Sequence, residues 1–179
     1  IDTIYREAQR ATRITGNLLA FSRKRESDKR LISINEVVEK SLELTMHQLK
    51  VNNIEVVVEL QPDLPPTMVD SHQMEEVFVN IINNAAQAML EVHKRGKLVV
   101  RTRKSDGMIQ VTFTDDGPGI PKENLQRIFD PFFTTKEGGT GLGLSIVYSI
   151  IKEHHGSIEL QSQVGKGTVF AIIFEERSK

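Results

Sequence analysis

Small or apolar residues recur three or four positions apart through the first 22 residues of the chain, at Ile1, Ile4, Ala8, Ala11, Thr15, Leu18 and Ser22. This spacing predicts a helix with one apolar face, because residues three and four apart lie on the same side of a helix. The polar run over residues 22–30 that follows predicts a linker. We therefore expect a boundary near residues 24–31.

Beyond residue 31 the pattern alternates between helical and extended periods. Apolar spacing predicts a helix of about 15 residues with Asn35 as its N-cap, a helix over about 71–92, and a helix over about 142–155 that ends at Gly156. Extended, β-branched segments predict strands near 31–34, 54–60, 97–104, 109–115, 157–163 and 167–175. The fold class that follows is α+β, a two-layer sandwich in which about three helices cover one face of a mixed sheet, plus the amino-terminal helix.

Composition narrows the classes of protein that this chain can belong to. The 179 residues include no cysteine, which excludes disulfides and thiolate chemistry, and no apolar run reaches the ~20 residues that cross a bilayer. The net charge of -1 gives no electrostatic argument for a nucleic-acid partner. Residues 1–30 carry 8 Lys and Arg against 4 Asp and Glu, so a basic appendage precedes an acidic body.

Three asparagines interrupt the apolar pattern of the helix predicted over about 71–92, and Asn80, Asn84 and Gln87 fall on one stripe of it. Neutral amide oxygens suit Mg²⁺ that is also held by phosphates, since this ion takes few protein ligands. A helix face whose asparagines are only solvated is the alternative.

Two glycine-bearing segments flank a run of phenylalanines. In the first, Asp115 ends a strand before Gly117 and Gly119, where a carboxylate can accept a hydrogen bond from an exocyclic amine and glycines admit a flat ring; an ordinary turn is the alternative. In the second, Gly139, Gly141 and Gly143 open a helix whose N-terminus suits a phosphate; a flexible hinge is the alternative.

The segment between these two glycine-bearing segments has the composition of a mobile lid over about residues 129–139. Phe129, Phe132 and Phe133 lie in a stretch bounded by glycines, which is typical of a loop that packs in one state and opens in another. Lys136 in this segment either reaches a terminal phosphate or is an ordinary surface lysine.

The order and spacing of these segments resemble the ATP-binding domain of sensor histidine kinases, within the superfamily that includes DNA gyrase, the heat-shock chaperone ATPase and the mismatch-repair ATPases. The resemblance covers about residues 31–176: VNIINNAAQA is similar to the asparagine box, DDGPGI and GGTGLGL to the two glycine boxes, and FDPFFTTK to the phenylalanine box. GKGTVF at 165–170 resembles a later strand turn of the family.

What the resemblance implies is a Mg²⁺-dependent ATP site. It implies that Asn84 is the magnesium ligand with Asn80 as a second candidate, that Asp115 binds the adenine amino group, and that Thr168 supports a water network there. It implies Lys136 as the candidate catalytic residue, while Gln87 departs from the lysine or arginine that many members carry. The full set of implied ATP-binding residues is Asn80, Asn84, Gln87, Asp115, Gly117, Gly119, Ile120, Phe132, Thr135, Lys136, Gly139, Thr140, Gly141, Leu142, Gly143, Leu144 and Thr168.

Residue 80 bears on the reaction type. Hydrolytic members of the superfamily have a glutamate at this position to activate water, whereas an asparagine side chain is no general base at neutral pH. The resemblance therefore implies phosphoryl transfer to another side chain. A serine kinase or ATPase of the same superfamily, or a nucleotide-sensing module without turnover, are the alternatives.

The amino-terminal segment resembles the second helix of the dimerisation and phosphoacceptor domain of these kinases. None of the five histidines has the sequence setting of the family's acceptor, and we expect the adjacent His154 and His155 to be a solvated pair at a helix end. The expected organisation is a partial dimerisation domain over residues 1–30 and an ATP-binding kinase domain over residues 31–179.

The expected partners are the acceptor-histidine helix of the parent kinase, a response regulator, and a second copy of this chain in weak association through residues 1–22. The expected location of this fragment is the cytoplasm, and whether its parent is anchored in a membrane stays open.

Overall fold

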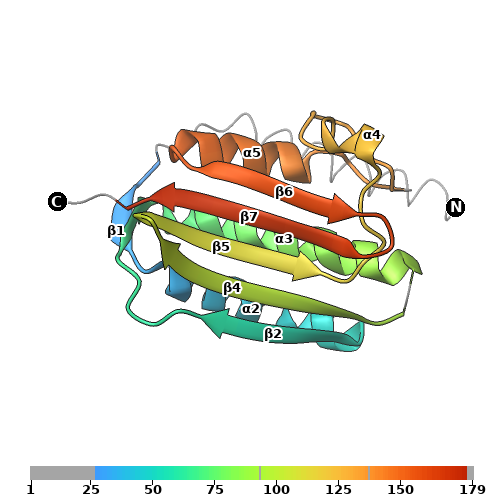
Figure 1. Ribbon diagram of the computed structural model, residues 1–179, viewed down its shortest axis with the longest axis horizontal. Helices are drawn as coiled ribbons and strands as arrows, with labels where there is room; N and C mark the ends of the chain where they lie inside the picture. Colours follow the sequence, from blue (N-terminus) through green and yellow to red (C-terminus); the bar gives the residue numbers. More distant parts are fainter. Residues whose placement is uncertain (1–26, 93, 137, 177–179) are drawn as a thin grey trace, which may run out of the picture.

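The computed structural model describes residues 27–92, 94–136 and 138–176, and its centre is a five-stranded sheet (Figure 1). The strand order is β2-β4-β5-β7-β6. The bounds are Ile54–Leu60 for β2, Gly96–Ser105 for β4, Met108–Asp115 for β5, Ser157–Gln163 for β6 and Gly167–Glu175 for β7. A second, two-stranded sheet pairs β1 (Arg30–Ile32) with β3 (Thr67–Val69).

Three long helices lie against one face of the large sheet, as Figure 1 shows: α2 (Ile34–Val51), α3 (Ser71–Val92) and α5 (Gly143–Glu153). A short helix, α4 (Lys122–Leu125), belongs to the connection between β5 and α5. The β2–β4 pair is parallel and the other three pairs are antiparallel, so the sheet is mixed. The predicted fold class is confirmed for this part of the chain. The predicted amino-terminal helix lies outside the described residues.

Helix α3 forms the centre of the core because its apolar residues repeat with the helical period. Met74, Val77, Phe78, Ile81 and Ile82 are fully buried, and the ring of Phe78 packs against that of Phe113 on β5 with centroids 5.4 Å apart. Burial of each such side chain stabilises the fold by about 1.5–3 kcal/mol. The helix is thereby fixed on the sheet, with its asparagine stripe turned to one side of the buried face.

The hairpin that joins β4 and β5 follows from its turn residues. Asp106 and Gly107 adopt left-handed backbone conformations, with φ of 53° and 73°, which a two-residue hairpin turn requires and which Asp-Gly tolerates well. This turn fixes the register, in which Ser105 pairs with Met108 and Leu98 with Asp115. The end of β5 that carries Asp115 is thus held at one edge of the molecule.

The predicted N-cap of α2 was wrong. The helix begins at Ile34 with Ser33 as its N-cap, so Asn35 lies inside the first turn. Its amide instead donates to the carbonyl oxygen of Gln61 at 2.9 Å and accepts from the hydroxyl of Thr102 at 2.8 Å. The local sequence favoured Asn35 as a helix cap, but its side chain instead forms hydrogen bonds with segments far away in the sequence.

The prediction that His154 is solvated was also wrong. Its side chain is only 6% exposed; Nδ1–H donates to the carbonyl oxygen of Ile150 at 2.8 Å and Nε2 accepts from the main-chain N–H of Asp70 at 3.1 Å. This pattern fixes the neutral tautomer with its proton on Nδ1. Burial lowers the pKa of His154. His155 is exposed, as predicted.

Residues 27–29 lead into β1 and form hydrogen bonds with the start of α3 and the end of α5. The N–H of Asp28 donates to Asp70 Oδ2 at 2.9 Å, Ser27 donates to the side chain of Gln73, and Lys29 donates to the carbonyl oxygen of Glu153 at the end of α5. We call this contact region the junction. None of the helices among the described residues combines the length and apolarity needed to cross a bilayer.

Candidate functional site

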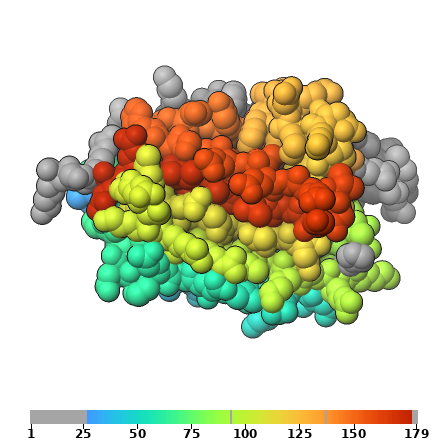
Figure 2. Space-filling view, viewed as in Figure 1, coloured from blue at the N-terminus to red at the C-terminus, as the bar shows by residue number. Residues whose placement is uncertain are grey.

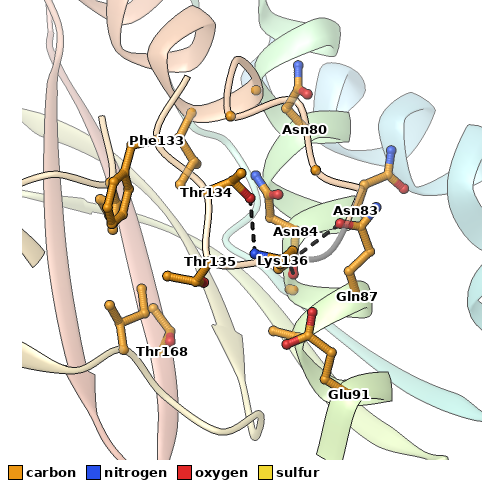
Figure 3. A pocket seen from close by; sticks show the side chains of 18 of the residues that line it. Asn80, Asn83, Asn84, Gln87, Glu91, Phe133, Thr134, Thr135, Lys136 and Thr168 are labelled. Atoms are coloured by element: carbon orange, nitrogen blue, oxygen red, sulfur yellow. Dashed lines mark hydrogen bonds between the residues drawn. The ribbon is translucent and has the colours of Figure 1, made fainter. Parts of the chain in front are cut away.

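A cavity of about 740 Å³ lies between α3, the end of β5, the start of β7 and the segment that leads into α5. Figure 3 shows it from close by, with Asn80, Asn83, Asn84 and Gln87 along one helix and Thr134, Thr135 and Lys136 from residues 129–139. We call residues 129–139, apart from residue 137, the lid. A volume of this size is within the range of small-molecule sites.

The asparagine stripe of α3 forms one wall of the cavity. Asn80, Asn84 and Gln87 all line it, as their spacing predicts. The Asn80 amide donates to the main-chain oxygen of Glu76 at 2.9 Å, which leaves the side-chain oxygen of Asn80 available. A Cβ added to Gly143, the first residue of α5, would lie 3.1 Å from that oxygen, so the helix start approaches the stripe closely.

Asp115 lines another part of the cavity, at the end of β5. Its side chain is 5% exposed, and Oδ1 accepts from the N–H of Gly117 at 2.9 Å. Burial raises the pKa of the Asp115 carboxyl, and the hydrogen bond from Gly117 opposes this shift. A buried carboxylate that faces a cavity is a strong acceptor for a polar ligand group.

Thr168 is held beside Asp115 by the sheet. The two residues are register partners on β5 and β7. Gly167 precedes Thr168 with a φ of 99°, and a Cβ at this position would collide with the main-chain oxygen of Asp115, so both features require glycine. The Ser162 hydroxyl lies 3.1 Å from the Thr168 hydroxyl and accepts from the N–H of Ile120 at 2.8 Å. Ser162 thus joins two walls of the cavity, a role that the sequence analysis missed.

The aromatic residues of the lid have three different environments. The ring of Phe129 packs on Tyr148 of α5 with centroids 5.5 Å apart, and Arg127 lies 4.5 Å from the ring centre of Phe133. Phe132, in contrast, is 61% exposed and has a φ of 67°. Its N–H donates to the main-chain oxygen of Gly141. Gly141 itself has a left-handed backbone conformation, and a Cβ on it would collide with the backbone of Phe132.

Lys136 reaches from the lid across the cavity to α3. Its ammonium donates to the main-chain oxygen of Asn84 at 3.2 Å and to the side-chain oxygen of Gln87 at 3.4 Å (Figure 3). Burial lowers the pKa of Lys136, while Glu91 and Asp115 act in the opposite direction. Lys136 is the one lysine or arginine among the described cavity residues, against three carboxylic acids, Glu76, Glu91 and Asp115.

Most of the predicted site residues line the cavity. They are Asn80, Asn84, Gln87, Asp115, Gly119, Ile120, Thr135, Lys136, Gly139, Thr140, Gly141, Gly143, Leu144 and Thr168.

Three predicted site residues do not line the cavity. Gly117 lies behind Asp115 and supports its carboxylate, Leu142 is buried at the start of α5, and Phe132 points to solvent.

Some lining residues were not among the predicted site residues. Asn83 and Phe133 belong to segments that the sequence analysis singled out, and Glu91 lies on α3, but none of the three was assigned to the site. Asn124 and Ile128 come from the connection after β5, and their character fits an ordinary connection equally well. Only the path of the chain around α4 brings them to the cavity.

The residues present fit a magnesium ion that is shared with a phosphate ligand. Among the described residues, no group of three or more His, Cys, Asp or Glu side chains is placed to hold a metal ion by itself. The amide oxygens of Asn80 and Asn84 are hard, neutral donors at the cavity wall. Such a set suits an ion that keeps water and phosphate oxygens as its other ligands.

The fold and this cavity define a nucleotide-binding domain of the ATPase type. Residues 69–178 match the family model described as "Histidine kinase-, DNA gyrase B-, and HSP90-like ATPase", which is more than half of the 179-residue chain. The chain belongs to this family. Membership supports nucleotide binding in the cavity.

Named relatives and solved structures agree with this assignment. The chain is 35% identical over 174 residues to the signal transduction histidine-protein kinase AtoS of Escherichia coli, covering 97% of this chain and 28% of AtoS. It is similar to the solved catalytic domain of histidine kinase ThkA in a nucleotide-free form, with a TM-score of 0.74, 29% identity, and coverage of 83% of this chain and 96% of that domain.

A further structure, of ThkA in complex with the response regulator protein TrrA, matches with a TM-score of 0.80 and 27% identity over 99% of this chain and 50% of the matched chain. The chain thus spans less than a third of the length of AtoS but nearly all of the isolated ThkA catalytic domain.

Proposed function

We propose that this chain binds Mg²⁺–ATP and transfers the γ-phosphoryl group to a histidine outside this sequence, as the catalytic part of a two-component histidine kinase. The observation that carries the proposal is the cavity itself, which buried Asp115 and the stripe of Asn80 and Asn84 line together. One wall suits the base of a nucleotide and the other suits metal-bound phosphates.

Each wall has an assigned part in binding. Asp115 accepts a hydrogen bond from the adenine amino group, and Thr168 lies beside it to hold water. Asn84, with Asn80 as a second ligand, would hold the magnesium ion, which when bound neutralises charge on the phosphates during transfer. The glycine segment, Gly139, Gly141 and Gly143, leads into the start of α5 and offers N–H groups to the phosphates.

The residues favour transfer to a side chain over hydrolysis. In transfer, a neutral imidazole nitrogen attacks the γ-phosphorus, the bond between that phosphorus and the bridging oxygen breaks, and ADP leaves with the electron pair. Imidazole needs no base to make it nucleophilic, whereas water does. Asn80 stands where a base would be needed, and its amide cannot accept a proton at neutral pH.

The acceptor is proposed to be a histidine on a dimerisation helix of the parent kinase, and the next partner a response regulator. His154 is unsuitable as an acceptor because both of its ring nitrogens are engaged in the core. The structure of ThkA with TrrA is titled as a kinase–regulator complex and supports the same kind of partner here. The division at residues 30 and 31, weak association through residues 1–22 and a cytoplasmic location remain parts of the proposal.

The deciding experiment supplies the chain with γ-labelled ATP, Mg²⁺ and a separately purified dimerisation domain that contains an acceptor histidine. We expect acid-labile label on that domain, and none when its histidine is replaced by alanine. Asn84→Ala is the matched variant in this chain and should lose the transfer.

Release of labelled phosphate without transfer would instead identify an ATPase. ATP binding without either reaction would identify a nucleotide-sensing module.

A further inference from the structure

The charges around the cavity are poorly matched to a polyphosphate ligand. Three lining residues carry carboxyl groups: Glu76, Glu91 and Asp115. Among the described residues that line the cavity, Lys136 is the one lysine or arginine. A fixed cation is what a phosphate chain needs in a partly desolvated site. Where Lys136 lies therefore governs which ligands the cavity accepts.

The Lys136 ammonium is hydrogen-bonded to α3. It donates to two neutral oxygens there, the main-chain oxygen of Asn84 and the side-chain oxygen of Gln87, at 3.2 and 3.4 Å. Asp115 and Glu91 attract the same ammonium. Both hydrogen bonds are long, so this position is held by several weak interactions.

We propose that Lys136 has two positions, a parked one on Gln87 and Asn84 that partly fills the cavity, and a second one on a phosphate of the bound nucleotide. In this scheme Gln87 is a positioning residue that holds the lid down through Lys136. The inference rests on the proposed function, because the second position requires a nucleotide in this cavity.

The consequence is discrimination between nucleotides and nucleosides. A ligand with phosphates offers the ammonium new anionic acceptors in exchange for Gln87 and Asn84. Adenosine offers none, so it has to displace Lys136 from the acids and oxygens that hold it. Releasing Lys136 costs the same free energy for either ligand, and only ATP offsets that cost through its phosphates, so the cavity favours ATP over adenosine.

Two variants separate parking from phosphate binding. Lys136→Met removes the cation with little change of volume, and we expect ATP affinity to fall by about tenfold or more, the loss typical of a hydrogen bond to a charged group. The same change should leave adenosine affinity unchanged or raise it. Gln87→Leu keeps the cation but removes the side-chain acceptor. It should raise the affinities for ATP and adenosine by the same factor, because neither bound state keeps the hydrogen bond between Lys136 and Gln87.

The measurements are dissociation constants for ATP, ADP and adenosine by calorimetry, and hydrogen exchange of residues 129–136 without ligand. Both variants should exchange faster over these residues than the unmodified chain. Gln87→Glu retains an acceptor and should restore slow exchange. Lys50→Met, at the exposed end of α2, is the control and should change neither measurement.

Equal exchange in the unmodified chain and both variants overturns the parked position. Parallel changes in ATP and adenosine affinity in Lys136→Met overturn the discrimination. If the unmodified chain binds no ATP, the proposed function fails and the discrimination fails with it. In that event the ligand-free exchange still decides whether Lys136 is parked on α3.

Discussion

Helix α3 is attached to the rest of the molecule in two different ways, at the junction near its start and at the lid farther along. At the start, Asp70 Oδ1 accepts from the N–H groups of His72 and Gln73 at 2.9 and 3.1 Å. Asp70 Oδ2 accepts from Asp28, and the N–H of Asp70 donates to His154. Between the described residues of the lid and the helix, the hydrogen bonds are the two long ones that Lys136 donates.

The difference lies in what would be lost when each contact opens. Opening the junction leaves a helix N-terminus uncapped and a buried histidine without its partner, which costs the desolvation of those groups. Opening the lid releases one ammonium into water, where it is well solvated. The same helix therefore has a fixed attachment that positions the asparagine stripe and an exchangeable one that admits a ligand.

The largest effect should follow from breaking the junction. Asp70→Ala removes the cap of α3 and the acceptor for Asp28, and we expect a loss of about 2–4 kcal/mol in the free energy of unfolding. Urea unfolding measures it. Glu43→Ala, on an exposed position of α2, is the control and should change stability by less than about 0.5 kcal/mol. A loss no larger in Asp70→Ala than in this control would contradict a fixed junction.

The second prediction is that ATP changes the contact between the lid and α3 and leaves the junction unchanged. ATP with Mg²⁺ at a hundredfold excess over Kd should stabilise the fold by about 2.7 kcal/mol, a rise in Tm of roughly 5–11 °C at this size. Hydrogen exchange should slow over the lid and stay unchanged at residues 27–29. Asp115→Asn should abolish the shift, and Asn84→Ala should remove its dependence on Mg²⁺.

Slower hydrogen exchange at both the lid and residues 27–29 would contradict this prediction, because the two attachments of α3 would then respond together. A Tm shift of normal size in Asp115→Asn would remove this carboxylate from the site.

The third prediction concerns the pH dependence of the junction. Burial lowers the pKa of His154 in the folded chain below its unfolded value of about 6.5. The unfolded chain therefore binds a proton that the folded chain does not, and stability that is present above about pH 6.5 is lost as the pH falls below it. Lys29 disfavours the charged histidine further, while Glu153 and Asp70 favour it.

Unfolding of the unmodified chain and of His154→Gln between pH 5 and 8 tests this, since the difference isolates His154 from other titrating groups. The unmodified chain should lose more stability than the variant as the pH falls. His155→Asn, at the exposed neighbouring position, should follow the unmodified chain. A pH dependence that moves with His155 would contradict the assignment.

The smallest effect should come from Ser162, which lies behind the cavity wall. Ser162→Ala removes hydrogen bonds to Ile120, Gly167 and Thr168 but no group that lines the cavity. We expect a loss of about 0.5–1.5 kcal/mol in stability and a similar loss in the free energy of ATP binding. Calorimetry checks both. Thr114→Ser, at the end of β5 outside the cavity lining, is a mild control.

The elements of this fold were predictable where one period or one turn decides them. Helix α3 was predicted at its observed bounds because its apolar positions keep a helical spacing over the whole length, and the β4–β5 hairpin followed from Asp106 and Gly107. Strand β3 was missed because three residues are too few to show a period. Its pairing with β1 depends on a segment far away in the sequence.

The site was predictable as a set of motifs but not as an arrangement. Asn80, Asn84 and Asp115 are unusual residues for their local pattern, and their types indicated the chemistry. The parked position of Lys136 and the burial of His154 depend on tertiary contacts with Gln87 and Asp70. Gln87 was predicted as part of the stripe but not as a partner of Lys136, and nothing in the local sequence marks Asp70, so both findings required the structure.

The pairing of β5 with β7 also has a consequence for folding. The hairpins β4–β5 and β6–β7 close locally, whereas joining them in the register Asp115 with Thr168 closes a chain loop that contains the whole lid. Loop-closure entropy grows only with the logarithm of length, so doubling the loop adds only about 0.6 kcal/mol to the cost of closing it. The lid is thus a place where insertions can accumulate in evolution at little cost to folding, while the sheet beneath it stays unchanged.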